Sequence, residues 1–130
     1  ATAILNKDCN FFVPLEDLCR QRKQKILTYS LTQPADLMAS SIEQHNNCLK
    51  FDLTIIDKVY RQQKVNLIGR FQLENLLCSL GLALATSSPI DNLIQALSTL
   101  QPVKGRMQHA GNFNGASIFI DYAHTPDALK

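Results

Sequence analysis

The stretch that decides the fold class begins with Thr2-Ala3-Ile4-Leu5 and ends with Lys25-Ile26-Leu27-Thr28-Tyr29-Ser30-Leu31, two apolar runs typical of short buried strands. Between them, Leu15, Leu18 and Cys19 recur at helical spacing, and a basic run suits the C-terminal end of a helix. Strand, helix and strand within about 30 residues are the minimum for a crossover between parallel strands. The sequence therefore predicts an α/β fold with parallel strands.

Three strand-like runs follow at residues 36–41, 48–57 and 63–68, and Asn46-Asn47 indicates a turn between the first two. In the second run, apolar Leu49, Phe51, Leu53 and Ile55 alternate with polar residues. This period of two is typical of a sheet with one solvated face. The pattern predicts a small antiparallel meander.

Two helices are predicted next. The first spans about residues 71–86, because five leucines fall at helical spacing: Leu73, Leu76, Leu77, Leu80 and Leu84. The second is predicted to begin with Ser88 as N-cap and Pro89 in the first helical position, and to stop at Pro102.

The end of the sequence predicts a hairpin and a further helix. Strand-like runs at 106–110 and 116–121 flank residues 111–115, which have the composition of a hairpin turn. Thr125 is suited to cap a helix opening at Pro126.

Composition sets limits on the partners of the chain. Its 130 residues fit one ordinary domain, and 45% hydrophobic residues supply enough apolar material for a core. A net charge of +2 argues against nucleic acid as a partner, and no apolar run approaches a membrane span. Four widely spaced cysteines favour free thiols over a metal site and hence a cytoplasmic location, although two disulfides in a secreted protein remain an alternative.

Asp121 and His124 are candidate nucleotide contacts. Asp121 directly follows an apolar strand, and α/β proteins bind ligands at the carboxyl ends of strands, where a carboxylate can accept hydrogen bonds from ribose hydroxyls. The alternative for Asp121 is a residue that ends the strand and caps the next turn. His124 has the chemistry to contact phosphate or a nucleotide group, and its alternative is an exposed polar side chain.

Arg106 and Asn75 complete the set of candidate binding residues. Arg106 follows Gly105 and offers a permanently charged group to phosphate, with a solvated loop charge as the alternative. Asn75, on the leucine-rich helix, is able to read an adenine edge or simply meet water. The sequence contains no P-loop pattern and no metal-ligand spacing, so we predict no catalytic and no metal-binding residue in this chain.

Three ordered motifs resemble the Mur ligases, the ATP-dependent muramyl-peptide ligases: Leu67-Ile68-Gly69-Arg70-Phe71, Gly105-Arg106-Met107 and Asp121-Tyr122-Ala123-His124-Thr125-Pro126-Asp127-Ala128-Leu129. Folylpolyglutamate synthetase carries variants of the last motif, whereas its full form points to the ligases that add the third amino acid. The resemblance implies residues 1–102 as the C-terminal half of a central ATPase domain. It implies residues 103–130 as the start of a Rossmann-like C-terminal domain.

The resemblance also implies a reaction and its site. ATP and Mg²⁺ would activate the D-glutamate carboxylate of UDP-N-acetylmuramoyl-L-Ala-D-Glu as an acyl phosphate, which the amine of a diamino acid then attacks. By motif, Asn75 would contact adenine, Arg106 the phosphate region and Asp121 the ribose, with His124 nearby. The family's P-loop and magnesium ligands would lie outside this stretch, so we expect a piece of a monomeric parent enzyme that is inactive alone and self-associates through uncovered edges.

One residue departs from the family's pattern. Where the family opens its helix Gly-Arg-Phe-Asn-x-x-Asn, this chain has Gln72, whose amide is one methylene further out, with Asn75 unchanged. A contact of residue 72 with adenine would have to shift. Because of Gln72, an alternative hypothesis is that the chain is a degenerate, ligase-like module that only binds. Cyanophycin synthetase is the closest alternative family. Neither the diamino acid, diaminopimelate or lysine, nor the organism follows from the sequence.

Overall fold

The predicted α/β fold is confirmed, and the parallel strands and the meander join in one sheet. The computed structural model describes residues 1–125, so the helix predicted at Pro126 lies outside the described residues. The elements, in chain order, are β1 (Thr2–Asn6), α1 (Phe12–Gln21), β2 (Lys25–Ser30), β3 (Leu37–His45), β4 (Cys48–Ile55), β5 (Lys58–Val65), α2 (Arg70–Ala85), α3 (Ile90–Leu97), β6 (Gln108–Phe113) and β7 (Ala116–Ile120).

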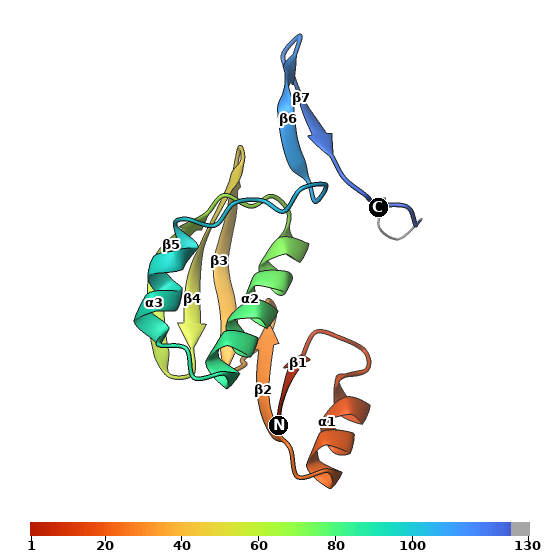
Figure 1. Ribbon diagram of the computed structural model, residues 1–130, viewed down its shortest axis with the longest axis vertical. Helices are drawn as coiled ribbons and strands as arrows, with labels where there is room; N and C mark the ends of the chain where they lie inside the picture. The colour runs from red at the N-terminus through yellow and green to blue at the C-terminus, as the bar shows by residue number, and fades with distance from the viewer. Residues whose placement is uncertain (126–130) are drawn as a thin grey trace.

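The five-stranded sheet has the order β1-β2-β3-β4-β5 (Figure 1), and its pairing changes from parallel to antiparallel at β3. β1 pairs with β2, and β2 with β3, in parallel, whereas β3, β4 and β5 pair antiparallel. The seam between β2 and β3 is short, because only Tyr29 and Ser30 have partners in β3. The Asp36 carboxylate strengthens it by accepting hydrogen bonds from the Thr28 N–H and hydroxyl, both at 2.7 Å.

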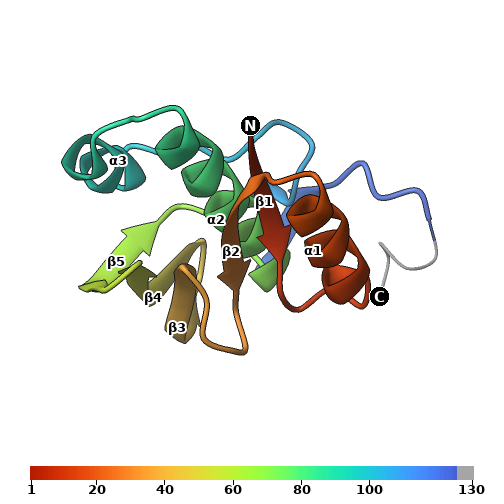
Figure 2. The ribbon, with the colours of Figure 1, turned by 90° about the horizontal axis from the view of Figure 1, so that it is seen from below.

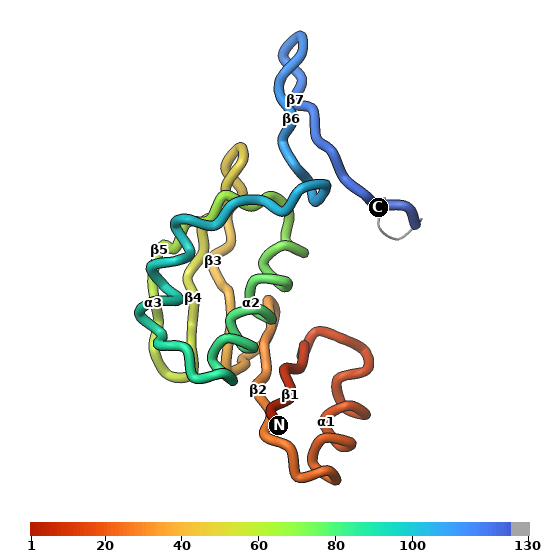
Figure 3. Tube along the Cα trace, viewed as in Figure 1, coloured from red at the N-terminus to blue at the C-terminus, as the bar shows by residue number. Residues whose placement is uncertain are grey.

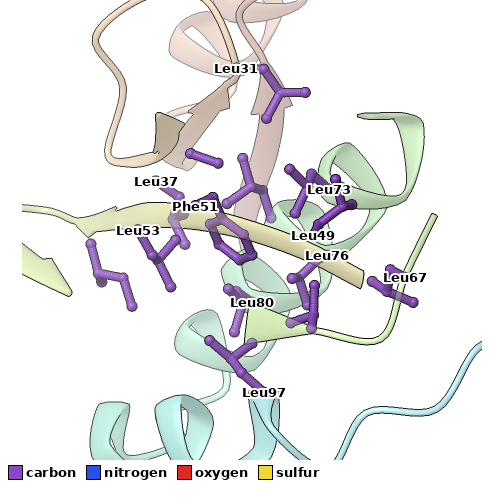
Figure 4. Close-up of a cluster of buried hydrophobic side chains, with 14 residues drawn as sticks. Leu31, Leu37, Leu49, Phe51, Leu53, Leu67, Leu73, Leu76, Leu80 and Leu97 are labelled. Atoms are coloured by element: carbon purple, nitrogen blue, oxygen red, sulfur yellow. The ribbon is translucent and has the colours of Figure 1, made fainter. Parts of the chain in front are cut away.

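The core lies between this sheet and the two later helices. The apolar residues of β4 face α2 and α3, and Figure 4 shows Phe51 and Leu53 among side chains from both helices, including Leu73, Leu80 and Leu97. The alternate residues of β4, such as Lys50, are exposed or half-buried, so the predicted solvated face is confirmed. Helix α1 lies beside β1, at the end of the sheet away from β5 (Figure 2).

Three strands differ clearly from the prediction, and one of them, β6, spans Gln108–Phe113 where residues 106–110 were predicted. β3 continues past residue 41, where Ser41 has φ +51 and the pairing with β4 shifts register between Ser40 and Glu43. Such a bulge breaks the alternation on which the prediction rested. β5 begins at Lys58 rather than Gln63. The prediction missed its first residues because most of them are polar and exposed, so they lack the apolar pattern of a strand.

The predicted start of α3 was off by one position. Pro89, with extended backbone, occupies the N-cap position, and the Ser88 side chain makes no capping hydrogen bond there. The helix therefore begins at Ile90. The predicted end was too late, since α3 stops at Leu97, before Leu100 and Pro102.

The hairpin β6–β7 forms a second sheet that extends from the rest of the chain (Figures 1 and 3). Its turn is Asn114-Gly115, both with positive φ (+50 and +83), as in the tight turns that match strand twist. The hairpin exposes Phe113, Ile118 and Ile120, and α1 exposes Val13 and Leu18. Apolar faces are thus uncovered within residues 1–125, while self-association stays a prediction.

Gly81 of α2 packs against Ile4 of β1, and we expect Gly81→Ala to destabilise the chain by up to about 2 kcal/mol. Alanine favours a helix over glycine by about 1 kcal/mol. However, the added Cβ would lie 2.7 Å from Ile4 Cγ2, and a stiff β-branched side chain yields poorly, so overpacking of roughly 1–3 kcal/mol exceeds that gain.

Urea unfolding of a double-mutant cycle measures this competition. In an Ile4→Ala background the clash is gone, and Gly81→Ala should become stabilising. Equal effects of Gly81→Ala in both backgrounds would show that the α2–β1 contact does not set the cost.

Candidate nucleotide-binding site

Arg106 and Asp121 lie on two segments that are hydrogen-bonded to each other. Arg106 is in the linker between α3 and β6, and Asp121 directly follows β7. The Met107 N–H donates to Asp121 Oδ2 at 2.8 Å, and the Tyr122 N–H donates to the Gly105 carbonyl at 2.9 Å. The two residues that the sequence assigned to phosphate and ribose are therefore brought to one place.

The Asp121 carboxylate is held by backbone groups. Besides the Met107 N–H, it accepts the Ala123 N–H at 2.7 Å, which closes an Asx turn. The turn-capping interpretation of this residue is thus what the geometry shows. A carboxylate has about four acceptor positions, so two remain on this exposed group for a ligand's hydroxyls. The ribose contact stays a prediction.

Gly105 allows the two segments to approach. Its φ is +71, and a Cβ built on it would overlap the Tyr122 ring. No side chain fits between the two without displacing one of them. The sequence motif Gly105-Arg106 thus has a packing reason here, because the glycine lets the Tyr122 ring lie against the backbone that carries Arg106.

Arg106 has a free side chain on a fixed backbone. Its guanidinium is exposed and makes no hydrogen bond or ion pair within residues 1–125. Its carbonyl, in contrast, accepts a hydrogen bond of 3.2 Å from Nε2 of Gln72, a buried residue at the start of α2. An unpaired, always-charged group is suited to bind a phosphate.

Asn75 and His124 lie near this place without touching the other two candidates in the described chain. Asn75 is exposed and lies one turn after Gln72, the residue of α2 that bonds to the Arg106 carbonyl. His124 is exposed, and its Nδ1–H donates to the Tyr122 carbonyl at 2.8 Å. No direct hydrogen bond joins the four predicted residues themselves within the described chain: the segments of Arg106 and Asp121 meet through the Met107 N–H, and α2, which carries Asn75, meets the Arg106 segment through Gln72.

A second polar cluster, which sequence reasoning missed, lies at the carboxyl ends of β1 and β2. Asp8 accepts hydrogen bonds from Ser30 Oγ (2.7 Å), Thr32 Oγ1 (2.5 Å) and the Leu31 N–H (2.7 Å). Burial by itself raises the pKa of Asp8, but the hydrogen bonds from Thr32, Leu31 and Ser30 outweigh it and hold the pKa below its ordinary value. Only a short polar run after each strand marked this cluster in the sequence.

The described residues give two further findings about metals and membranes. No group of three or more His, Cys, Asp or Glu in residues 1–125 is arranged to hold a metal ion. No helix in this part of the chain is long and apolar enough to cross a bilayer. The four cysteines are free, and Cys9 lies exposed in the turn after β1.

The family model described as Mur ligase middle domain matches residues 1–83, well over half of the chain. The chain belongs to the Mur ligase family. One relative within the family is the UDP-N-acetylmuramoyl-L-alanyl-D-glutamate–2,6-diaminopimelate ligase of Bacillus velezensis, which is 37% identical over 105 residues. The match covers 81% of this chain and 21% of that Mur ligase, so the chain spans about a fifth of its length.

Two solved structures share the fold of this Mur ligase chain. MurF from Acinetobacter baumannii has a TM-score of 0.85 at 18% identity, covering 99% of this chain and 27% of that one. An FPGS–AMPPCP complex has a TM-score of 0.69 at 20% identity, covering 90% of this chain and 29% of that one. At these identities the likeness concerns the fold alone.

Proposed function

We propose that this chain is the nucleotide-contacting part of a longer, cytoplasmic, ATP-dependent ligase of peptidoglycan synthesis. The ligase would add a diamino acid to UDP-N-acetylmuramoyl-L-Ala-D-Glu. The observation that carries this proposal is the 37% identity to a relative whose name states that acceptor and diaminopimelate. The chain would comprise the end of the central domain, to residue 102, and the start of the C-terminal domain, from residue 103.

The paired segments at Arg106 and Asp121 support the nucleotide role. In the proposal the free guanidinium of Arg106 contacts the phosphates, and the two open acceptor positions of Asp121 bind ribose hydroxyls. Asn75 contacts the adenine edge from α2, and His124 lies beside the nucleotide. AMPPCP, bound by one of the fold's neighbours, is an analogue of ATP and fits this assignment.

The chemistry would proceed in two steps. The γ-phosphoryl group of ATP transfers to the D-glutamate carboxylate, and the amine of the diamino acid then displaces phosphate from the acyl phosphate to form an amide. Positive charge at the phosphates stabilises the transfer, which is what Arg106 would contribute. No side chain of residues 1–125 is assigned as nucleophile or general base.

The Mg²⁺ that the family implies is assigned to no residue of 1–125. Among these residues no group of three or more His, Cys, Asp or Glu is arranged around a common point. The sequence also lacks a P-loop. Neither the metal nor the main phosphate cradle is therefore assigned to residues 1–125, and no step is derived through the metal.

Assay of the longer protein tests the proposal. With ATP and UDP-N-acetylmuramoyl-L-Ala-D-Glu, we expect product with diaminopimelate or with lysine. We further expect Arg106→Ala to raise KM for ATP about 10-fold, as for the loss of one charged contact worth about 1.4 kcal/mol.

A matched control is Arg61→Ala, which removes an arginine from β5 that already pairs with Asp52 at 3.1 Å. It should leave KM for ATP unchanged. Absence of product with both diamino acids would rule out the proposed reaction. Product formation with equal effects of Arg106→Ala and Arg61→Ala would instead rule out the assignment of Arg106.

A further inference from the structure

Gln72 bridges the two parts of the chain. Its Nε2 donates to the Arg106 carbonyl, 34 residues away, and this is the one hydrogen bond between residues 1–102 and residues 103–124. Gln72 is 7% exposed, although it lies at the start of a helix beside exposed Phe71. A buried amide that is hydrogen-bonded to a loop backbone fixes that loop to the helix.

The loop that Gln72 contacts is also held by four hydrogen bonds of the backbone of residues 105–107. The Gly105 N–H donates to Gln108 Oε1 at 3.1 Å, and the Gly105 carbonyl accepts the Tyr122 N–H. The Arg106 N–H donates to the Val103 carbonyl, and the Met107 N–H to Asp121. The contact from Gln72 to the Arg106 carbonyl completes this set and ties it to α2.

We propose that Gln72 is a positioning residue that sets where α2 holds the Arg106 backbone, and so directs the guanidinium toward the nucleotide. The amide that the motif comparison placed toward adenine is used on the protein itself, which leaves Asn75 as the amide free to contact the base. The part of this inference that concerns the nucleotide rests on the proposed function.

The geometry explains why a glutamine serves here. Its longer side chain carries the amide one methylene further from the helix than asparagine does, and the resulting bond is already 3.2 Å long. A shorter side chain on the same backbone would leave both the amide and the carbonyl without their partner in a part-buried place. Methionine at this position has a similar length and no donor, so it removes the bond while filling the space.

The first test uses this 130-residue chain and hydrogen exchange measured by NMR. In Gln72→Met, we expect the amides of Arg106 and Met107 to exchange about 10-fold faster, with amides in the middle of α2 and in β4 unchanged. The control is Gln33→Met, which removes the same kind of bond, from Gln33 Nε2 to the Lys7 carbonyl at 2.8 Å. Unchanged exchange at residues 106–107 in Gln72→Met would overturn the inference.

The second test uses the longer protein and separates positioning from general destabilisation. We expect Gln72→Met to raise KM for ATP about 10-fold with kcat within about two-fold. Because Gln72 acts through Arg106, the double variant Gln72→Met/Arg106→Ala should be no worse than Arg106→Ala alone. Additive effects on KM would overturn the role in ATP binding. If the longer protein does not use ATP at all, the proposed function fails, while the exchange result still decides whether Gln72 fixes the loop.

Discussion

Phe51→Ala is expected to lower the free energy of unfolding by about 3–5 kcal/mol, which is the usual cost of truncating a buried aromatic side chain. Phe51 is 1% exposed and lies at the centre of the cluster between β4 and the two later helices. Truncation removes apolar contacts on both sides and leaves a cavity that close-packed leucines cannot fill without strain. Urea unfolding followed by circular dichroism measures the loss.

The hairpin supplies a matched control. Phe113 is the same residue type in a strand, but it is 67% exposed, so Phe113→Ala should change stability by less than about 0.5 kcal/mol. If Phe113→Ala costs as much as Phe51→Ala, the core does not lie where the structure places it. A loss below about 1 kcal/mol for Phe51→Ala would lead to the same conclusion.

Asp8→Ala is expected to cost about 2–3 kcal/mol at pH 7, because it leaves the fully buried Ser30 hydroxyl and the Leu31 N–H without their acceptor. The cost should depend on pH. The pKa of Asp8 is lower in the folded chain than the ordinary value of 3.8, so the folded state favours the ionised form. This stabilisation is present above about pH 4 and is lost as the pH falls through the folded-state pKa.

Stability measured between pH 2 and pH 7 tests the sign of this effect. The free energy of unfolding should fall less steeply below about pH 4 (the acid limb) in Asp8→Ala than in the parent chain. Asp17→Ala, at an exposed position of α1, should leave both the stability at pH 7 and the acid limb nearly unchanged. An acid limb as steep in Asp8→Ala as in the parent would remove Asp8 as a source of the pH dependence.

The sequence predicted those elements whose side-chain period is intact. The leucines of α2 and the alternation in β4 mark one buried face each, and both elements lie within two residues of their predicted bounds. The extension of β3 was missed, because the bulge at Ser41 moves the following side chains out of phase. Nothing in the local pattern showed that the meander would continue the parallel strands, since that pairing depends on two residues of β2.

The sequence motifs predicted which residues belong to the candidate site, but not the hydrogen bonds that hold them. Arg106 and Asp121 were named from motif and strand position, and the structure joins their segments through the Met107 N–H. The bond from Gln72 to the Arg106 carbonyl was not predictable, because a backbone acceptor leaves no mark in the sequence. One signal was present: Gln72 lies four residues before Leu76 and so falls on the buried stripe of α2, where a polar residue needs a partner.

The short seam between β2 and β3 divides the sheet into two units, which we expect to form at different times during folding. Strands β3, β4 and β5 are neighbours in sequence, so their contacts close small loops and form early, whereas β1 and β2 must wait for a crossover through α1. With only two residue pairs and the Asp36–Thr28 clasp between them, the units have little backbone pairing in common. Opening of the native sheet would therefore begin at that clasp, and the β1–α1–β2 unit would leave as one foldon.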